Sequence, residues 1–287
     1  MASTDLAELE AGLDELERPG ERTRRRRTVA ALFPPLVALG GFLATWQIAA
    51  ANNWGGKQDW QLPSPSQTWT AAADQWSQGR VQAAVLNSLL RGAQGFAAAL
   101  IVGTLLGLLM SRFRFVRAAI GPFVSGLQSL PSVAWVPAGI IWFGVGESVM
   151  YFVILLGAVP SIANGLLAGI DHIPPLYGRV GRVLGATGVS ALRHVTLPAA
   201  LPGYLAGLKQ GWAFSWRSLM AAEIIATSSR VGLGLGGYLD EGRQLSDQAV
   251  VLSGIVVILA VGVGIELLVF APVERRMLQR RGLGARA

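Results

Sequence analysis

The sequence predicts an all-α protein that crosses a membrane about six times. Of the 287 residues, 52% are hydrophobic and 14% are charged, with a mean hydropathy of +0.47, whereas soluble domains carry about 25% charged residues. Six apolar stretches are each close to or above the roughly 20 residues that a helix needs to cross a bilayer core. They cover residues 29–51, 88–110, 118–143, 149–170, 201–225 and 249–270. The charged faces that long helices of a soluble bundle would need are missing between them.

Basic residues fall on alternate loops between these stretches, which predicts the orientation. One side holds the run Arg22–Arg27 and Arg112, Arg114, Arg117, Arg179, Arg182, Arg193, Arg275, Arg276, Arg280, Arg281 and Arg286. The other side holds only Lys57, Arg80, Arg230 and Arg243. Because Lys and Arg accumulate in cytoplasmic loops, we expect a multi-pass protein of the plasma (inner) membrane with both termini in the cytoplasm.

The composition divides the chain into three regions. Residues 1–27 form an acidic extension followed by the basic run, residues 28–272 the transmembrane domain, and residues 273–287 a basic cytoplasmic tail. The acidic part has leucines at helical spacing, which fits either a solvated extension or a short helix that docks on a cytoplasmic partner. The external loop 52–80 contains four tryptophans, which favour membrane interfaces, so we expect a surface helix there.

The third stretch is expected to be broken. Charge-free sequence runs from Ala118 to Gly146, which as one helix would be about 43 Å long against a bilayer core of about 30 Å. Pro131 and Pro137 supply breaks, and backbone freed by proline in a bilayer is tolerated only next to protein or a water-filled cavity. The break should therefore face the protein interior with three candidate path residues: Gln128, Ser129 and Ser132. A simple kink satisfied by neighbouring helices is the alternative.

Four ionisable residues lie at membrane depth: Arg91, Arg217, Glu223 and Glu266. Such residues are costly in hydrocarbon and usually face a cavity or a partner. Arg217 and Glu223 are six positions apart, about 240° around a helix, so at least one needs a partner elsewhere. Both are candidates for a path through the protein, with a structural role as the alternative, whereas Arg91 and Glu266 are expected to extend toward the headgroups. Glycines four residues apart predict close helix packing at Gly103/Gly107, Gly165/Gly169 and Gly203/Gly207/Gly211.

The sequence shows no catalytic or metal site. It has no cysteine, which excludes thiolate nucleophiles and cysteine-ligated metals, and His172 and His194 are not at a metal-ligand spacing. It lacks the Gly-x-x-x-x-Gly-Lys-Ser/Thr motif, so we expect no phosphate-binding loop. The run Gly232–Gly237 superficially matches a dinucleotide motif, but it follows no strand and is interpreted as a bend. The arginines are spread over four segments without interleaved aromatic residues, which argues against nucleic acid.

The cytoplasmic loop 171–200 carries the most specific motif. Two short helices are expected around Gly185, which can adopt a left-handed bend, and Pro198 fixes the start of the fifth apolar helix. In this loop the chain resembles the permease subunits of type I ATP-binding-cassette (ABC) importers, which carry Glu-Ala-Ala, three residues, Gly, nine residues and Ile-x-Leu-Pro. The matching residues are Gly185, Val195, Leu197 and Pro198, and the Glu-Ala-Ala positions hold Arg179-Val180-Gly181.

The resemblance extends from about Leu62 to the C-terminus. It is strongest to the nitrate/sulfonate/taurine branch, and aliphatic-sulfonate permeases are the most similar. It implies a MetI-like permease fold. The segments that carry it are Leu62-Pro63-Ser64-Pro65, Leu130-Pro131, Ile141-Trp142-Phe143-Gly144, Leu197-Pro198-Ala199-Ala200-Leu201-Pro202 and Ala222-Glu223.

The resemblance also implies the partners. They are a second copy of this chain, two ATPase subunits that bind ATP and Mg, and a solute-binding protein that docks outside. The chain itself would hold no cofactor and would be no enzyme. The solute would be an aliphatic sulfonate, with nitrate, taurine or another small solute as alternatives. The residues that would couple the loop to the ATPase are Arg179, Gly185, Ala186, Thr187, Val195, Leu197 and Pro198.

A stand-alone secondary transporter or channel is the alternative of another class. Such proteins commonly have internal repeats, and no repeat relates residues 29–170 to residues 201–270. A membrane enzyme would need a cluster of His, Asp, Glu or Ser/Lys residues, and none is visible.

Overall fold

The computed structural model describes residues 21–52, 54, 61–226 and 231–280, and every regular element among them is helical. The predicted all-α class is thereby confirmed for this part of the chain. The chain divides into two compact units, Met1–Gln67 and Thr68–Ala287. The acidic extension up to residue 20 and the last seven residues of the basic tail, 281–287, lie outside the described residues.

The first unit contains helix α2 (Glu21–Ala51), which begins in the basic run and continues through the first predicted apolar stretch. From Leu36 onward most of its side chains are exposed, and Phe42 is exposed by 63%. A helix that is apolar on all sides is typical of a membrane span. Near the end of α2, Nε1 of Trp46 donates a hydrogen bond to the carbonyl oxygen of Pro63 at 3.0 Å.

Within the predicted external loop, helix α3 (Pro65–Ser77) forms as expected. Its tryptophans Trp69 and Trp76 are exposed by 77% and 58%. Exposed tryptophans suit a helix that lies at a membrane interface, and that location stays a prediction.

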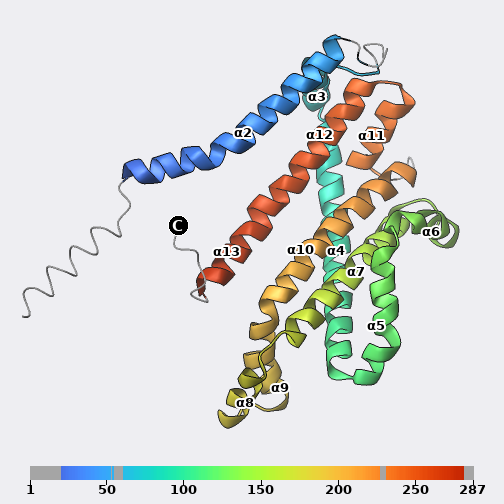
Figure 1. The fold of residues 1–287 in the computed structure, drawn as a ribbon. Coiled ribbons are helices and arrows are strands. Elements are labelled where there is room, and N and C mark those ends of the chain that lie inside the picture. The colour runs from blue at the N-terminus through green and yellow to red at the C-terminus, as the bar shows by residue number, and fades with distance from the viewer. Residues whose placement is uncertain (1–20, 53, 55–60, 227–230, 281–287) are drawn as a thin grey trace, which may run out of the picture. The chain divides into compact units, whose positions relative to one another are not determined.

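Helices α4 (Arg80–Arg112), α7 (Glu147–Asp171) and α10 (Leu197–Ile225) form the centre of the second unit (Figure 1). They contain the second, fourth and fifth predicted apolar stretches. Glycines lie where these helices approach one another. Positions at which an added Cβ would meet the neighbouring helix are Gly103 and Gly107 against α7, and Gly165 of α7 against Gly207 of α10. The predicted close packing at small residues is confirmed here.

The third predicted stretch is broken as expected. Helix α5 (Arg114–Ser129) ends before Pro131, and a 3₁₀ turn, η1 (Ser132–Trp135), leads into the short helix α6 (Val136–Phe143). The two halves are bent by 101°. Pro131 has no backbone N–H to continue the hydrogen bonds of α5, so the chain turns at this point.

The C-terminal part of the second unit contains α11 (Leu235–Gln244) and α12 (Gln248–Ile265). A π-helical turn, η3 (Glu266–Phe270), joins α12 to α13 (Ala271–Arg280) without interruption. The sixth predicted stretch is therefore helical, and the helix continues into the first residues of the predicted tail.

Among the described residues, three helices are long and apolar enough to cross a membrane: Arg80–Arg112, Glu147–Asp171 and Gln248–Gln279. The bent pair α5–α6 would be a fourth. The two other predicted spans correspond to α2 and α10. The apolar described part of α2 is the shorter helix Leu36–Ala51. Helix α10 carries three charged residues, Lys209, Arg217 and Glu223. Helices thus occupy all six predicted stretches, while length and hydropathy alone identify fewer spans.

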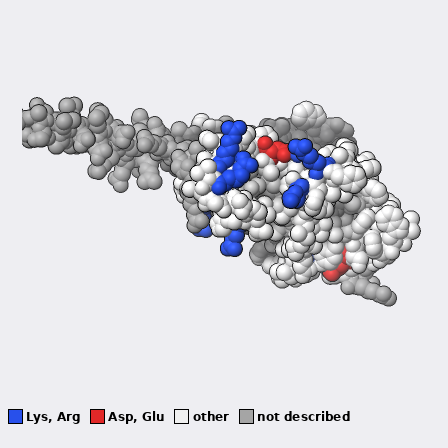
Figure 2. All heavy atoms as spheres, turned by 90° about the horizontal axis from the view of Figure 1, so that it is seen from below, with Lys and Arg blue, Asp and Glu red and all other residues white. Residues whose placement is uncertain are grey.

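The basic turns of the second unit lie at one end of the bundle. The α4–α5 turn and the segment from α8 (Pro175–Val183) to α9 (Gly188–Ala191) are both at the lower end in Figure 1. Figure 2 shows Lys and Arg side chains at several places on this face and fewer acidic ones. Here Arg117 and Asp171 form an ion pair of 2.7 Å that links the start of α5 to the end of α7. Two of the predicted basic loops, the α4–α5 turn and the segment from α8 to α9, thus lie at the same end of the second unit.

Candidate functional site

The break between α5 and η1 lines a half-open cavity of about 300 Å³, which α7 and α10 complete. Four of the five predicted path residues line it together: Gln128, Ser129, Ser132 and Arg217. The first three come from the break itself, and Arg217 comes from α10, so residues about 90 positions apart share one cavity. The fifth candidate, Glu223, lies elsewhere and is described below.

Gly157 of α7 lets α10 approach the broken helix closely. A Cβ at Gly157 would lie 2.7 Å from Oγ of Ser218. Ser218 donates a hydrogen bond to the carbonyl oxygen of Phe214 at 2.7 Å, and its Oγ is 2.5 Å from Oγ of Ser132. Ser129 donates to the carbonyl oxygen of Gly126 at 2.7 Å. The hydroxyl protons at the cavity are therefore already engaged within the protein.

Arg217 keeps unused hydrogen-bond donors. Its Nε donates to the carbonyl oxygen of Ala213 at 3.1 Å, and its guanidinium carbon lies 4.7 Å from the ring centroid of Phe214. The side chain is exposed, and no carboxylate of the described residues pairs with it. The structural role, which was the alternative to a role in the path, is thus supported only by the backbone partner of Nε. The two terminal nitrogens of the guanidinium remain available at the cavity.

Gln128 is fixed on α7 by residues that the sequence did not single out. Its Nε2 donates to Oγ of Ser161 at 3.1 Å, and its Oε1 accepts a hydrogen bond from Nδ2 of Asn164 at 3.2 Å. Polar residues inside an apolar helix would have been the signal for both. These bonds hold the last turn of α5 in place beside the break.

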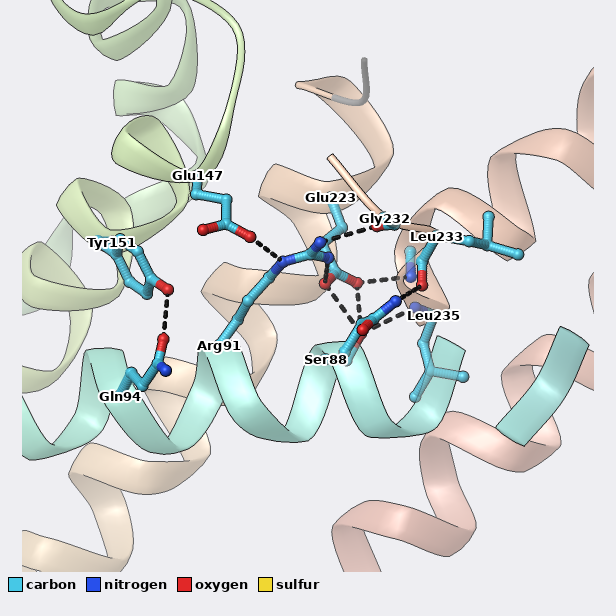
Figure 3. Close-up of polar contacts among 11 residues, drawn as sticks. Ser88, Arg91, Gln94, Glu147, Tyr151, Glu223, Gly232, Leu233 and Leu235 are labelled. Carbon is cyan, nitrogen blue, oxygen red and sulfur yellow. Dashed lines mark hydrogen bonds and ion pairs between the residues drawn. The ribbon is translucent and has the colours of Figure 1, made fainter. Parts of the chain in front are cut away.

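A buried ion pair connects α4 to α10 (Figure 3). Nη1 of Arg91 lies 3.0 Å from Oε1 of Glu223, and the two residues are only 5% and 1% exposed. The expectation that Arg91 extends toward the headgroups is therefore wrong, because a buried carboxylate holds its guanidinium inside the bundle. As expected, at least one of Arg217 and Glu223 has a partner outside α10, since Glu223 pairs with Arg91 of α4. The burial of this pair favours a structural role for Glu223 over a role in the path.

The glycine-rich run encloses the Glu223 carboxylate (Figure 3). The backbone nitrogen of Gly236 donates to Oε2 of Glu223 at 2.9 Å, and Ser88 donates to the same carboxylate at 2.7 Å. A Cβ at Gly234 would overlap Oε1 of Glu223, and one at Gly236 would lie 2.5 Å from the carbonyl oxygen of Met220. The glycines thus permit close approach to a side chain of the protein itself.

Arg91 also reaches two further groups. Its Nε donates to Oε1 of Glu147 at 3.1 Å, and its Nη2 donates to the carbonyl oxygen of Gly232 at 2.7 Å. Glu147 is the first residue of α7 and its side chain is 49% exposed. One guanidinium therefore joins α4, α7, α10 and the segment that leads into α11.

Glu266 likewise has a partner inside the protein. Nζ of Lys209 on α10 lies 2.8 Å from Oε1 of Glu266 and 2.9 Å from Oε2 of Glu274 on α13. The pairing was not predicted, and since the Glu266 side chain is 47% exposed, its extension toward the headgroups stays a prediction. Lys209 was missed, because a lysine in an apolar helix was not considered as a bridge between helices.

The predicted coupling loop contains the left-handed bend. Gly185 has a φ of +82°, as expected. The backbone nitrogen of Ala186 donates to the carbonyl oxygen of Gly181 at 2.8 Å, and that of Gly185 donates to Arg182 at 3.0 Å, which is the hydrogen-bond pattern of a Schellman motif. The bend therefore ends α8 and directs the chain into α9.

The remaining residues of the motif set the position of α8. A Cβ at Gly181 would lie 2.9 Å from Cγ2 of Val195, so the glycine in the Glu-Ala-Ala segment allows α8 to lie against the π-helical turn η2 (Leu192–Thr196). Thr187 directly precedes α9, and its carbonyl oxygen accepts a hydrogen bond from the backbone nitrogen of Ser190 at 3.1 Å. Leu197 and Pro198 begin α10, which continues from η2 without interruption, and the backbone nitrogen of Leu197 donates to the carbonyl oxygen of Leu192 in the π-helical pattern.

Residues 99–278 match the model of the family described as binding-protein-dependent transport system inner membrane component. A protein of Methanocaldococcus jannaschii, described as an ABC transporter permease, is 33% identical over 175 residues, 61% of this chain and 64% of that protein, which is less than two thirds of its length. The bicarbonate transport system permease protein of Synechococcus elongatus is 29% identical over 256 residues, 85% of this chain and 89% of that protein. The taurine transport system permease protein of Escherichia coli is 34% identical over 194 residues, which are 68% of this chain and 67% of that protein.

Proposed function

The chain belongs to the family of inner membrane components of binding-protein-dependent transport systems, and we propose that it is the permease subunit of an ATP-driven importer for a small anionic solute. A relative named for bicarbonate transport supports an anion, and one named for taurine transport supports a solute that carries an anionic group. Taurine carries a sulfonate group, which supports an aliphatic sulfonate, and a relative named for nitrate import supports nitrate as the alternative. Membership of this family argues against a stand-alone secondary transporter or channel.

The observation that carries this proposal is the cavity at the helix break with Arg217 beside it. A guanidinium near the centre of a bilayer costs about 2.5–3.5 kcal/mol or more, unless water or a partner solvates it. Here its unused N–H groups lie at a cavity lined by Gln128, Ser129 and Ser132. Arginine binds oxyanions with two parallel hydrogen bonds, so a sulfonate or carboxylate could be received as it passes. Among the described residues that line this cavity, Arg217 is the one charged residue, which suits transient binding of an anion.

The assembly follows from the same proposal. Two copies of this chain would combine with two ATPase subunits that bind ATP and Mg, and a solute-binding protein would dock on the opposite side. The basic end of the second unit would face the cytoplasm, with both termini on that side of the plasma (inner) membrane. The coupling loop 171–200 would transmit the movement of the ATPases, and its proposed contact residues are Arg179, Gly185, Ala186, Thr187, Val195, Leu197 and Pro198.

Replacing Arg217 tests the path through the cavity. In proteoliposomes that contain the ATPase and binding protein, Arg217→Gln is expected to lower the maximal uptake rate of an alkanesulfonate about tenfold, equivalent to about 1.4 kcal/mol. Arg217→Lys retains the charge but loses the planar pair of N–H donors, so its rate should lie between those of the wild type and Arg217→Gln. Arg114→Gln, at an exposed arginine outside the cavity, is the matched control. Full uptake by Arg217→Gln, or loss of the assembled complex in both Arg217 variants, would contradict a role in the path.

Replacing Gly185 by Val is expected to abolish most transport while the chain still inserts into the membrane. The backbone of Gly185 has a positive φ of +82°, where a β-branched residue costs about 1–3 kcal/mol. No neighbouring heavy atom lies within 4 Å of the Cβ position, so the effect would come from the backbone alone. Gly185→Asn is the control, because asparagine tolerates the left-handed conformation. Normal uptake by Gly185→Val at equal membrane content would show that coupling does not need this bend.

A further inference from the structure

A second cavity lies between α7, α10 and the first residues of the loop 171–200, toward the end of the bundle where α8 lies (Figure 1). It has a volume of about 530 Å³ and shares no lining residue with the cavity at the helix break. Three polar side chains line it: His172, Tyr177 and Gln210. The other described residues that line it are small or apolar, and none is acidic. The second cavity therefore offers polar groups without a negative charge that would repel an anion.

Gln210 is the polar residue of this cavity that the packing does not explain. It lies near the middle of α10, which runs from Leu197 to Ile225, and it is exposed. No residue in the described part of the chain forms a hydrogen bond with its side-chain amide. An amide without a partner is costly in hydrocarbon, because its N–H groups and its oxygen lose water there. Its place at the depth of a bilayer core therefore indicates water or a polar ligand in the second cavity.

The exposed side of α10 differs from the exposed sides of α4 and α12. On those two helices, Leu105 and Leu259 are exposed by 62% and 65%, as suits contact with lipid. Between Pro202 and Arg217, α10 exposes no large apolar side chain. Its exposed residues there follow helical spacing and are called the α10 stripe below: Pro202, Ala206, Gln210, Ala213 and Arg217. The α10 stripe therefore connects the second cavity to the arginine of the first one.

The two cavities follow one another along the same face of the α7–α10 pair. On α7, Nδ2 of Asn164 donates to Oε1 of Gln128 beside the break at 3.2 Å, and the next residue, Gly165, lines the second cavity. On α10, Gln210 and Arg217 are seven positions apart, which is about two turns and about 10 Å along the helix axis. Their side chains therefore point to the same side of α10.

We propose that the second cavity is a further binding site for the transported anion, an inference that rests on the proposed function. The solute reaches it from Arg217 along the α10 stripe. The amide of Gln210 donates hydrogen bonds to the oxyanion, as does the hydroxyl of Tyr177, which has no hydrogen-bond partner among the described residues either. Both donors are uncharged, so they hold the anion less tightly than the guanidinium of Arg217 does. The second cavity thus suits the step before release.

A dry contact with a second copy of the chain is the competing explanation of the α10 stripe, because small residues also suit close helix packing. Two observations favour a water-filled face. The surface is hollowed by about 530 Å³ at Gln210. At the other end of the stripe lies Arg217, whose guanidinium needs water or an anion at membrane depth.

Cysteine labelling tests whether water and an anion reach this face. The chain has no cysteine, so Ala206→Cys, Gln210→Cys and Ala213→Cys each introduce a single thiol. The complete transporter with cysteine-free partner subunits is labelled in nanodiscs during ATP hydrolysis. The reagent is sulfonatoethyl methanethiosulfonate, an anion that does not cross lipid. Because the thiolate is the reacting form and needs water, the three variants should react roughly tenfold faster than the control Leu105→Cys on α4.

Transport after labelling tests whether the solute uses the second cavity. In proteoliposomes, labelled Gln210→Cys should import an alkanesulfonate about fivefold more slowly than the same variant before labelling, because the attached sulfonate fills the site and repels an anion. Labelling conditions applied to the cysteine-free wild type should leave its uptake unchanged. Fast labelling of Gln210→Cys without any loss of uptake would show that water fills the cavity and the solute does not pass it, which overturns the proposal.

The remaining outcomes separate this inference from the proposed function. If all three variants react as slowly as Leu105→Cys, the face is closed to water and the second site is refuted, while the proposed function stands. Disulfide cross-links between copies at Ala206→Cys would then assign the face to a dry contact between them. If the wild-type complex imports no anion at all, the proposed function is refuted, and the second anion site with it.

Discussion

Replacing Arg91 by Ala is expected to lower the free energy of unfolding by about 3–5 kcal/mol, the usual cost of removing one partner from a buried ion pair. Glu223 is 1% exposed, so water cannot replace the lost guanidinium. Its carboxylate would retain neutral donors such as the hydroxyl of Ser88 and the backbone nitrogen of Gly236. Because Arg91 also binds Glu147 and Gly232, the loss would loosen α4, α7, α10 and the segment before α11 together.

Denaturant unfolding of the purified chain in detergent measures this effect. Arg80→Ala is the matched control, because its ion pair with Glu241 has both side chains about one third or more exposed, and such pairs contribute about 1 kcal/mol or less. The double variant Arg91→Met/Glu223→Gln should recover part of the stability, since no unpaired buried charge remains. Equal losses for Arg91→Ala and Arg80→Ala would contradict the structural role of the buried pair.

Local features were predictable from the sequence because they depend on neighbouring residues. The break at Pro131 follows from the missing backbone donor and from a charge-free run too long for one straight span. The bend at Gly185 follows from glycine between two short helical patterns. The convergence of Gln128, Ser129 and Ser132 on one cavity follows from the same break.

Long-range pairings were not predictable in this way. Arg91 and Glu223 are 132 positions apart, and hydropathy contains no information about which buried charges will meet. An arginine near the end of an apolar stretch therefore suggested contact with headgroups, and Lys209 escaped notice for the same reason. The glycines near residue 234 have a visible pattern, but only the folded chain shows that they enclose a carboxylate of the protein itself.

Replacing Gly165 by Val is expected to have a comparably large effect, because it forces α7 and α10 apart. A Cβ at Gly165 would overlap Cα of Gly207, and one at Gly207 would lie 2.7 Å from Cα of Gly165. A Cβ at Gly203 would likewise lie 2.5 Å from Cα of Gly169. The atoms that would be met are backbone atoms, so no side chain can rotate away and the helices themselves would have to move. A cost of about 3 kcal/mol, at the upper end for overpacked cores, is expected.

The same helix pair positions Ser218 against Gly157, beside the cavity at the break. Gly165→Val should therefore lower both the midpoint of thermal unfolding and the rate of ATP-driven uptake by the complex that remains folded. Gly264→Ala is the control, since no neighbouring heavy atom lies within 4 Å of its Cβ position in α12. Because alanine is the better helix former, this variant should be neutral or slightly more stable, by up to about 1 kcal/mol. If Gly165→Val unfolded at the same temperature as Gly264→Ala, the close crossing of α7 and α10 would be refuted.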